Sequence, residues 1–378
     1  MRSYNHLWEK VISPDNIKLA IRNASKGKRD RTRVREIFEN MDKYIPHFQK
    51  MAMTYKHKRK PPKIIYDGIS RKKREIIVPS FDEQVLHHMI VNVLSPIITK
   101  GMYHHSHGSI PGKGPTKGAA AIKKWIAHDT KNVKYFLKMD IKQFFGSVPH
   151  DKLEELIRKK IHDERFNSLL HEVIDCTEIG LPLGFHTSHW LANWYLQGLD
   201  HYIKQELKAV HYIRYMDDMV IFGSNKRKLH KMREEIEKYL NERLGLRLKE
   251  NWQVCRFSYK DRATGGDRGR DLDFMGYRFY RMRVVLRKSI MIKMSRKARK
   301  MAAKEKPTIY DCRQILSALG WIKQTDTYGM YEKWIKPFVS FGKCKKRISN
   351  YDKKRNKEVK SYELEKMYKF GQHEACGA

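Results

Sequence analysis

Two adjacent aspartates, Asp217 and Asp218, stand between two short apolar runs, residues 211–215 and 219–222. Both runs are rich in aromatic and β-branched residues, which predicts a β-hairpin with the two acids near its tip. The simplest alternative is an exposed turn, in which Asp is common. The apolar flanks favour a different interpretation, because they would hold the acids at the edge of a core, where mutual repulsion is costly unless a cation binds.

A third acid follows a second predicted strand. Apolar residues recur at positions 133, 135, 137 and 139, and this alternation ends on Asp140, where a strand would end as well. Three carboxylates on neighbouring strands can hold two Mg²⁺ ions about 3.5–4 Å apart, which activate an attacking 3′-hydroxyl and stabilise a pyrophosphate leaving group. The three acids therefore indicate nucleotide polymerase chemistry.

These acids lie within three sequence motifs that follow one another in a fixed order. Tyr-Met-Asp-Asp at 215–218 matches a Y-x-D-D box, Asp140 with Phe144 and Phe145 matches a D-x-x-x-F-F/Y box, and residues 180–189 match a G-x-P-x-G-x-x-x-S box. The chain thus resembles the reverse transcriptases of bacterial retroelements, in particular those of diversity-generating retroelements and group II introns. The resemblance implies an α+β right-hand polymerase with fingers, a ferredoxin-like palm and a helical thumb.

The resemblance also implies a catalytic and metal-binding set. The catalytic residues would be Asp140, Asp217, Asp218 and Lys249. Ile141 would join the three acids in binding two Mg²⁺ ions, which Mn²⁺ can replace. Lys249 matches a lysine that protonates the pyrophosphate leaving group, although an exposed lysine without a catalytic part is the plain alternative.

Further residues would contact the substrates. The nucleotide-binding residues would be Arg74, Lys73, Phe144, Phe145 and Gly184, and the template and primer contacts would be Leu183, Ser188, Tyr215, Met216, Lys113 and Gly276. The guanidinium fork of Arg74 suits phosphate oxygens better than a lysine does. Phe145 takes the place of a steric gate that excludes a 2′-hydroxyl, and the alternative is an ordinary core phenylalanine.

Net charge and composition point to a polyanionic partner. The 378 residues include 79 Lys and Arg against 42 Asp and Glu, a net charge of +37, together with 20 Tyr and seven Trp. Aromatic faces among cations favour nucleic acid over a membrane, with strongly salt-dependent binding. We expect a template RNA with its cDNA or primer, a dedicated structured RNA, and a small accessory protein as an open possibility.

The remaining composition excludes several classes of protein. The five cysteines have no C-x-x-C spacing, which argues against a zinc site and a disulfide framework. No apolar run approaches about 18 residues, and residues 1–5 lack the core of a signal peptide. We therefore expect a soluble cytoplasmic protein.

The expected domain order places the motifs. It runs from a basic helical extension (1–60, with a break near Pro14) through fingers and the start of the palm (61–139), palm (140–280) and helical thumb (281–345) to a basic tail (346–378) that could be disordered without RNA. The fingers should contain a β-hairpin of residues 63–67 and 71–79. The thumb should contain helices at 290–304, 310–319 and 328–335. Its aromatic residues should be core or stacking residues, most of them in the core: Trp321, Tyr328, Tyr331 and Trp334.

Local signals predict several boundaries within the palm. Thr187 and Ser188 are cap residue types for the helix after residue 186, and Ser224 should cap a helix that stops at Gly245. Residues 258–270 should form a polar hairpin loop. Residues 272–279 resemble a primer-grip strand, in which Gly276 would allow close approach of the backbone.

Two positions depart from the commonest family pattern and bear on the biological role. Most relatives have Gln where this chain has Leu183, and an aliphatic residue there resembles the enzymes of diversity-generating retroelements, which make errors at template adenines. His189 stands where most relatives have Pro and where those retroelement enzymes have Gln. We hypothesise that Leu183 lowers copying fidelity because it cannot form the hydrogen bond that Gln would form. The alternatives are a reverse transcriptase of an antiphage defence system that copies a non-coding RNA, and a non-catalytic, maturase-like RNA-binding protein.

Overall fold

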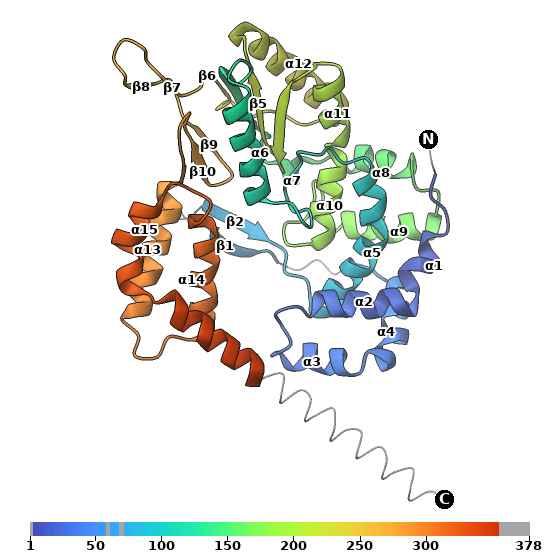
Figure 1. Ribbon diagram of the computed structural model, residues 1–378. Helices are drawn as coiled ribbons and strands as arrows, with labels where there is room; N and C mark the ends of the chain where they lie inside the picture. The colour runs from blue at the N-terminus through green and yellow to red at the C-terminus, as the bar shows by residue number, and fades with distance from the viewer. Residues whose placement is uncertain (1–2, 58–60, 68–71, 355–378) are drawn as a thin grey trace, which may run out of the picture. The chain divides into compact units, whose positions relative to one another are not determined.

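A four-stranded antiparallel sheet in the order β4-β5-β3-β6 runs through the first of two compact units (Figure 1). Its strands are β3 (Tyr135–Asp140), β4 (His211–Tyr215), β5 (Asp218–Gly223) and β6 (Gln253–Arg256). The computed structural model describes residues 3–57, 61–67 and 72–354, and the two units divide between Arg270 and Asp271. The four central residues of β5 are all buried, so both faces of this strand are covered.

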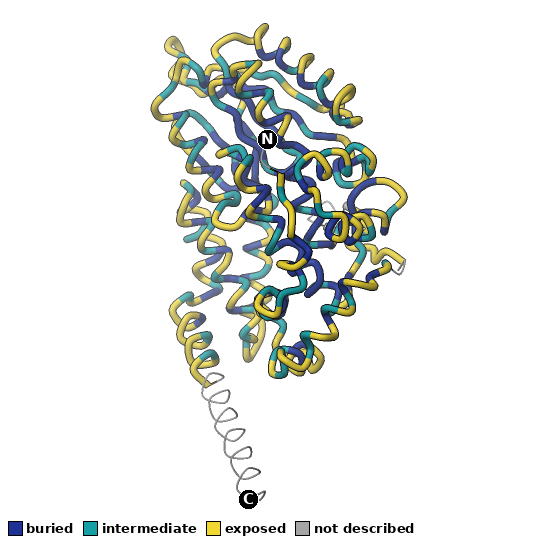
Figure 2. Tube along the Cα trace, turned by 90° about the vertical axis from the view of Figure 1, so that its right-hand side faces the viewer, coloured by how far each residue is buried: buried dark blue, intermediate teal, exposed yellow. Residues whose placement is uncertain are grey.

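Helices cover the sheet and extend the first unit. Helix α12 (Lys226–Leu244) packs on β3, β5 and β6, and α6 (Pro115–His128) packs on β4. The long helix α5 (Phe81–Lys100) packs against α10 (His186–Tyr195) and against the N-terminal helices α1 (Leu7–Ile12), α2 (Pro14–Ala24) and α4 (Met41–Met53). Figure 2 shows buried and exposed residues alternating along the helices, as expected where each covers a core with one face.

Shorter elements complete the first unit. They are α3 (Thr32–Glu39), the hairpin β1 (Lys63–Asp67) and β2 (Lys72–Ile76), α7 (Phe144–Ser147), α8 (His150–Arg158), α9 (Glu164–Ile174), α11 (Gln197–Gln205), and the hairpin β7 (Tyr259–Lys260) and β8 (Asp267–Arg268). Helix α5 begins with a reciprocal capping box, in which Ser80 accepts from the Glu83 amide and Glu83 accepts from the Ser80 amide.

The second unit combines a small sheet with helices. Strands β9 (Leu272–Phe274), β10 (Tyr277–Phe279) and β11 (Val284–Leu286) pair in the order β11-β10-β9. Helices α13 (Lys288–Ala302), α14 (Ile309–Ile322) and α15 (Tyr328–Trp334) and the 3₁₀ turn η1 (Lys336–Phe338) follow. Residues 341–354 are also helical, so helical structure reaches into the segment predicted as a tail, whose remainder lies outside the described residues.

Several sequence predictions are confirmed. Residues 211–215 pair with 218–222 as the predicted hairpin, residues 63–67 pair with 72–76, and residues 259–268 form the predicted polar hairpin. Residues 68–71, which join the second of these pairs, lie outside the described residues. The helix break before Pro14 and the stop at Gly245, which has a φ of 63°, are also as predicted. The division into fingers, palm, thumb and tail stays a prediction.

The predicted caps at 187, 188 and 224 are wrong. Helix α10 begins at His186, so Thr187 and Ser188 lie inside its first turn, where both side chains are buried. The Ser188 hydroxyl donates to the Pro182 carbonyl at 2.8 Å instead of capping the helix. Helix α12 is capped one residue later than predicted, because the side chain of Asn225 accepts from the Lys228 amide.

Two predictions for the second unit are also corrected. The segment 272–279 is a hairpin and not one strand, because Met275 and Gly276 both have positive φ (51° and 86°) and form a two-residue turn. Tyr328 and Trp334 are exposed (62% and 37%) and do not belong to a core.

Among the residues that the structure describes, no helix is both long and apolar enough to cross a membrane.

Candidate active site

The central hairpin brings the three predicted catalytic acids to one edge of the sheet. Tyr215 and Asp218 face each other across β4 and β5, so Met216 and Asp217 form the two-residue turn between the strands. Asp218 also lies directly opposite Asp140, the last residue of β3. Strand pairing therefore brings together the D-x-x-x-F-F/Y box at Asp140 and the Y-x-D-D box at Asp218, which are 78 residues apart in the sequence.

A loop from outside the motifs supports the turn. The His107 amide donates to the Arg214 carbonyl (2.9 Å) and the Arg214 amide donates to the His105 carbonyl (3.0 Å), which adds a short extended segment to the edge of β4. Gly108 then lies against Met216, and a Cβ atom added to Gly108 would come within 2.5 Å of the Met216 amide nitrogen. Only glycine therefore fits at position 108 beside the turn that carries Asp217.

The electrostatics of the acids favour a bound cation. Burial, together with the negative charges of Asp140 and Asp218, raises the pKa of Asp217 to about 7. The Oδ1 atom of Asp140 is buried and has no hydrogen-bond partner among the described residues. Partly buried carboxylates that repel one another and leave an oxygen unsatisfied are suited to divalent metal ions, which prefer oxygen ligands.

Lys249 supplies a cation of its own to this cluster. Its ammonium forms an ion pair with Oδ2 of Asp140, and its amide donates to the Asp140 carbonyl at 2.8 Å. Ile141 continues β3 by bridging to Leu248, and the Ile141 side chain is fully buried, so only its backbone could face a metal ion. Within the described part of the chain, no group of three or more His, Cys, Asp or Glu side chains is arranged as a ready metal cluster.

The two phenylalanines after Asp140 differ in exposure. Phe144 is buried in the core, whereas Phe145 is half-buried, with the two ring centroids 5.5 Å apart. The Leu181 amide donates to the Phe145 carbonyl at 2.5 Å. The G-x-P-x-G-x-x-x-S box of residues 180–189, which is the second motif in chain order, therefore fixes the backbone of the first motif, the box that begins at Asp140. The partial exposure of Phe145 leaves its ring able to meet a ligand.

The glycine of the second motif docks against the strand that leaves the β1–β2 hairpin. Gly184 has a φ of 111°, and a Cβ atom there would lie 2.2 Å from the Ile77 carbonyl oxygen. The Ile77 amide donates to the Leu183 carbonyl at 2.8 Å. Leu183 and Gly184 are therefore held by backbone contacts, which leaves Gly184 exposed and Leu183 half-buried.

The other predicted substrate contacts are spread more widely. Lys73 and Arg74 lie on the exposed strand β2, where Lys73 pairs with Glu75 at 3.2 Å. The ammonium of Lys113 donates to the carbonyls of Tyr103 (3.3 Å) and His104 (2.7 Å), so it holds its own loop together. Gly276 belongs to the second unit, where a Cβ atom would come within 2.7 Å of Ile290.

The motif pattern extends across most of the first unit. Residues 56–279 match the family described as "Reverse transcriptase (RNA-dependent DNA polymerase)". The chain belongs to the reverse transcriptase family. The match confirms the predicted fold class, an α+β right-hand polymerase. It also confirms the predicted resemblance to reverse transcriptases at the level of the family.

Known reverse transcriptases and intron proteins resemble parts of the chain. The retron Ec73 reverse transcriptase of Escherichia coli is 26% identical over 169 residues, which are 40% of this chain and 51% of that protein. An uncharacterized 91 kDa protein in the cob intron of Schizosaccharomyces pombe is 31% identical over 152 residues, or 38% of this chain and 18% of that protein. The matched segments thus span less than two thirds of these relatives.

Solved structures give a weaker likeness. Apo telomerase from Candida tropicalis aligns with a TM-score of 0.45 at 13% identity, covering 79% of this chain and 64% of that chain. A telomerase from Candida albicans in complex with a fragment of telomeric RNA aligns with a TM-score of 0.42 at 12% identity, covering 83% of this chain and 62% of that chain.

Sequence reasoning did not identify the contacts that hold this candidate site together. Asp200 and Asn193 both bond to the side chain of Arg214 at the base of the catalytic turn. His189 contacts the ring of Phe145, with ring centroids 5.4 Å apart. Asn193 and Asp200 lie four and eleven residues after His189, on the consecutive helices α10 and α11, but no motif marks them. The only sequence signal for Asn193 and Asp200 is that each is a polar residue within a helix pattern that is otherwise apolar.

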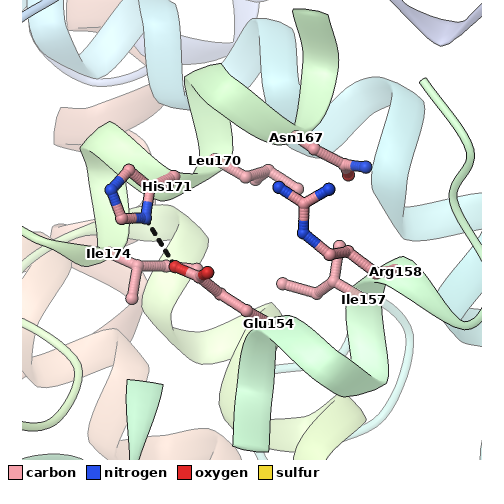
Figure 3. Close-up of a pocket in the computed structure, with 7 residues that line it drawn as sticks. All are labelled: Glu154, Ile157, Arg158, Asn167, Leu170, His171 and Ile174. Carbon is pink, nitrogen blue, oxygen red and sulfur yellow. Dashed lines mark hydrogen bonds and ion pairs between the residues drawn. The ribbon is translucent and has the colours of Figure 1, made fainter. Parts of the chain in front are cut away.

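A cavity of about 420 Å³ lies beside the second motif. It is lined by Lys28, Ile76, Ile77, Val78, Pro79, Gln84, His87, His88, Gly184, Phe185, His186 and His189. A smaller hollow between α8 and α9, shown in Figure 3, has a volume of only about 10 Å³, and its His171 side chain bonds to Glu154 at 2.6 Å. That hollow has room for no more than a water molecule and contains none of the predicted site residues.

Proposed function

We propose that this protein is an RNA-directed DNA polymerase of a bacterial or phage retroelement, which copies a dedicated template RNA into cDNA. The observation that carries the proposal is the meeting of Asp140, Asp217 and Asp218 at one edge of the central sheet, with one buried carboxylate oxygen left unsatisfied within the described residues. A binding protein has no need of repelling carboxylates in a strongly basic chain. The family match over residues 56–279 supports the same reaction class.

In this proposal the three acids and the backbone of Ile141 hold two divalent cations, Mg²⁺ or Mn²⁺. Such cations, when bound, activate the 3′-hydroxyl of a primer and stabilise the pyrophosphate that leaves. Burial and the neighbouring charges of Asp140 and Asp218 together raise the pKa of Asp217, and cation binding would relieve the repulsion among the three carboxylates. Lys249, which contacts Asp140, is placed to give a proton to the leaving pyrophosphate.

Residues around the acids would select the nucleotide. Phe145 is the proposed steric gate, because its half-exposed ring would exclude a 2′-hydroxyl, and Phe144 supports that ring from the core. Arg74 and Lys73, on the exposed strand β2, would bind the triphosphate of the incoming nucleotide. Gly184 would allow the backbone to approach the new base pair.

The template and primer would lie along the same face of the motifs. Leu183 is proposed to contact the templating base pair, and Tyr215 and Met216 to contact the primer end, because they adjoin Asp217 in the hairpin. Ser188 and Lys113 would act by fixing local backbone, because Ser188 donates to the Pro182 carbonyl and Lys113 to the His104 carbonyl. Gly276 would act through its close packing on Ile290. The net charge of +37 would make RNA binding weaken steeply as salt rises.

Primer extension with an Asp217→Asn variant tests the proposal. Wild-type protein, given Mg²⁺, deoxynucleotides and a primed RNA template, should make DNA, and Asp217→Asn should make none while it still folds and binds RNA. Asp267→Asn is the matched control, because Asp267 is an exposed aspartate in a surface ion pair with Lys260. Full activity of Asp217→Asn would refute the assignment of the acids.

Sequencing the DNA product addresses the biological role. We propose error-prone copying of the kind found in diversity-generating retroelements, so errors should concentrate at template adenines. Accurate cDNA would instead favour a reverse transcriptase of an antiphage system that copies a non-coding RNA. If the native RNA and any small accessory protein are supplied and still no DNA forms, a maturase-like binding protein becomes the better explanation.

A further inference from the structure

The ring of Phe145 contacts two other aromatic rings. Phe144 contacts it from the core, with ring centroids 5.5 Å apart and an interplanar angle of 61°. His189 contacts it from helix α10, with centroids 5.4 Å apart and an interplanar angle of 78°, which is an edge-to-face arrangement. The position of the Phe145 ring is therefore determined by one residue of its own motif and by one residue of the second motif.

His189 is itself fixed by a hydrogen bond. Its Nδ1 atom lies 3.3 Å from the hydroxyl of Ser109. Ser109 has a positive φ of 54°, a conformation that a non-glycine residue keeps only where its surroundings impose it. The preceding residue, Gly108, is the one that packs against Met216 in the catalytic turn. A continuous set of contacts thus runs from the catalytic turn through Ser109 and His189 to Phe145.

The His189 ring, which contacts Phe145, also borders open space. His189 lines the cavity of about 420 Å³ beside the second motif. Removing its imidazole would add the space that it fills to this cavity and would remove the edge-to-face contact with Phe145. Burial lowers the pKa of His189, so the imidazole is neutral near pH 7 and packs against Phe145 as an aromatic ring rather than as a cation.

We propose that His189 is a positioning residue that holds the Phe145 ring in place and so sets how strongly the enzyme prefers deoxynucleotides to ribonucleotides. The inference rests on the proposed function, in which Phe145 lies below the sugar of the incoming nucleotide. It assigns His189 no contact with the reacting atoms. Its effect should therefore be on the ratio of kcat/KM values for the two sugars more than on DNA synthesis itself.

The test measures kcat/KM for a deoxynucleotide and for the matching ribonucleotide on one primed RNA template. His189→Ala should reduce the preference for the deoxynucleotide by roughly two- to tenfold, the range expected for one edge-to-face ring contact. His189→Phe keeps a ring against Phe145 and should retain most of the preference. His189→Leu, which fills similar space without an aromatic edge, should lose preference as His189→Ala does and serves if the alanine variant does not fold.

Two further variants complete the design. Ser109→Gly removes the hydroxyl in a residue that suits a positive φ, so it should reduce the preference, but by less than His189→Ala. His186→Ala is the matched control, because His186 lines the same cavity while its ring packs on His88 and not on Phe145, and it should leave the preference unchanged.

The outcomes separate this inference from the proposed function. Phe145→Ala should abolish most of the preference for deoxynucleotides. If it does so while His189→Ala and His189→Leu keep the wild-type ratio, the role of His189 is refuted and the polymerase assignment stands. If wild-type protein makes no DNA even with its native RNA and any accessory protein supplied, the proposed function is refuted. If Phe145→Ala keeps the wild-type ratio, the assignment of Phe145 as the steric gate is refuted, and the role of His189 with it.

Discussion

The guanidinium of Arg214 forms a two-pronged ion pair with the carboxylate of Asp200, and both side chains are fully buried. The Nε atom donates to Oδ1 at 2.8 Å and the Nη2 atom donates to Oδ2 at 2.6 Å. The remaining nitrogen, Nη1, donates to the Asn193 side chain and to the Met216 carbonyl at 3.1 and 3.0 Å. One arginine thus ties the turn that presents Asp217 to helices α10 and α11.

Removing Asp200 should destabilise the first unit strongly. Asp200→Ala would leave the Arg214 cation buried without its counter-charge, which costs about 3–5 kcal/mol of folding free energy. Denaturant unfolding of the purified variant measures this change. Glu155→Ala is the control, because its ion pair with Lys159 is exposed and should be worth about 0.5 kcal/mol or less. A loss below about 1 kcal/mol for Asp200→Ala would contradict the anchoring role of this pair.

The sequence predicted those features that depend on local pattern. The alternation of apolar residues that ends on Asp140, and the two apolar runs around Asp217, were sufficient to predict the strands and the hairpin. Each signal lies within a few residues of the structure that it specifies, since side-chain alternation and turn residues act locally. The meeting of Asp140 and Asp218 followed from the motifs together with the family resemblance.

Features that depend on distant partners could not be predicted. Nothing in the sequence around Asp200 indicates that it neutralises Arg214, and the contact of Lys249 with Asp140 joins residues 109 positions apart. The cap prediction at Ser188 failed for the same reason, because its hydroxyl bonds to the Pro182 carbonyl in the core. Tertiary contacts override local cap preferences wherever a buried polar group must be satisfied.

Replacing Lys249 should have opposite effects on catalysis and on metal binding. Lys249→Gln should lower kcat by roughly 10²- to 10⁴-fold, the range for loss of a general acid. It should also tighten Mg²⁺ binding, because the ammonium that pairs with Asp140 would no longer compete for that carboxylate. Steady-state kinetics and titration calorimetry measure the two effects, and Lys226→Gln, on an exposed position of α12, is the control. Unchanged kcat would show that Lys249 serves only to pair with Asp140.

Replacing Leu183 should change copying fidelity. The Leu183 carbonyl is fixed by the Ile77 amide, so a substitution should alter the side chain without moving the backbone. Leu183→Gln adds a hydrogen-bonding amide and should reduce misincorporation roughly fivefold, which corresponds to about 1 kcal/mol for one hydrogen bond. Leu183→Met conserves volume without adding hydrogen-bonding capacity and should leave the error rate as it is. Sequencing of cDNA decides the matter, and equal error spectra for Leu183→Gln and wild type would disprove the hypothesis.

The buried histidine His87 should make the protein less stable in mild acid. Its side chain is fully buried against Phe185, with Nδ1 3.3 Å from the Thr187 hydroxyl. Burial lowers the pKa of His87 to about 3, and the nearby Glu83 opposes this shift only in part. The folded protein therefore keeps this imidazole neutral at pH values where the unfolded chain would protonate it.

The sign of the effect follows from this difference. An unfolded histidine has a pKa of about 6.5, so between about pH 6.5 and 3 the unfolded state binds more protons and gains stability as pH falls. His87 should thus cost the folded state up to about 1.4 kcal/mol per pH unit over this range. Unfolding free energies at pH 7 and pH 5 should differ less for His87→Gln than for wild type. His128→Gln, at an exposed position, should keep the wild-type difference, and an equal pH dependence for all three proteins would show that His87 is protonated within the fold.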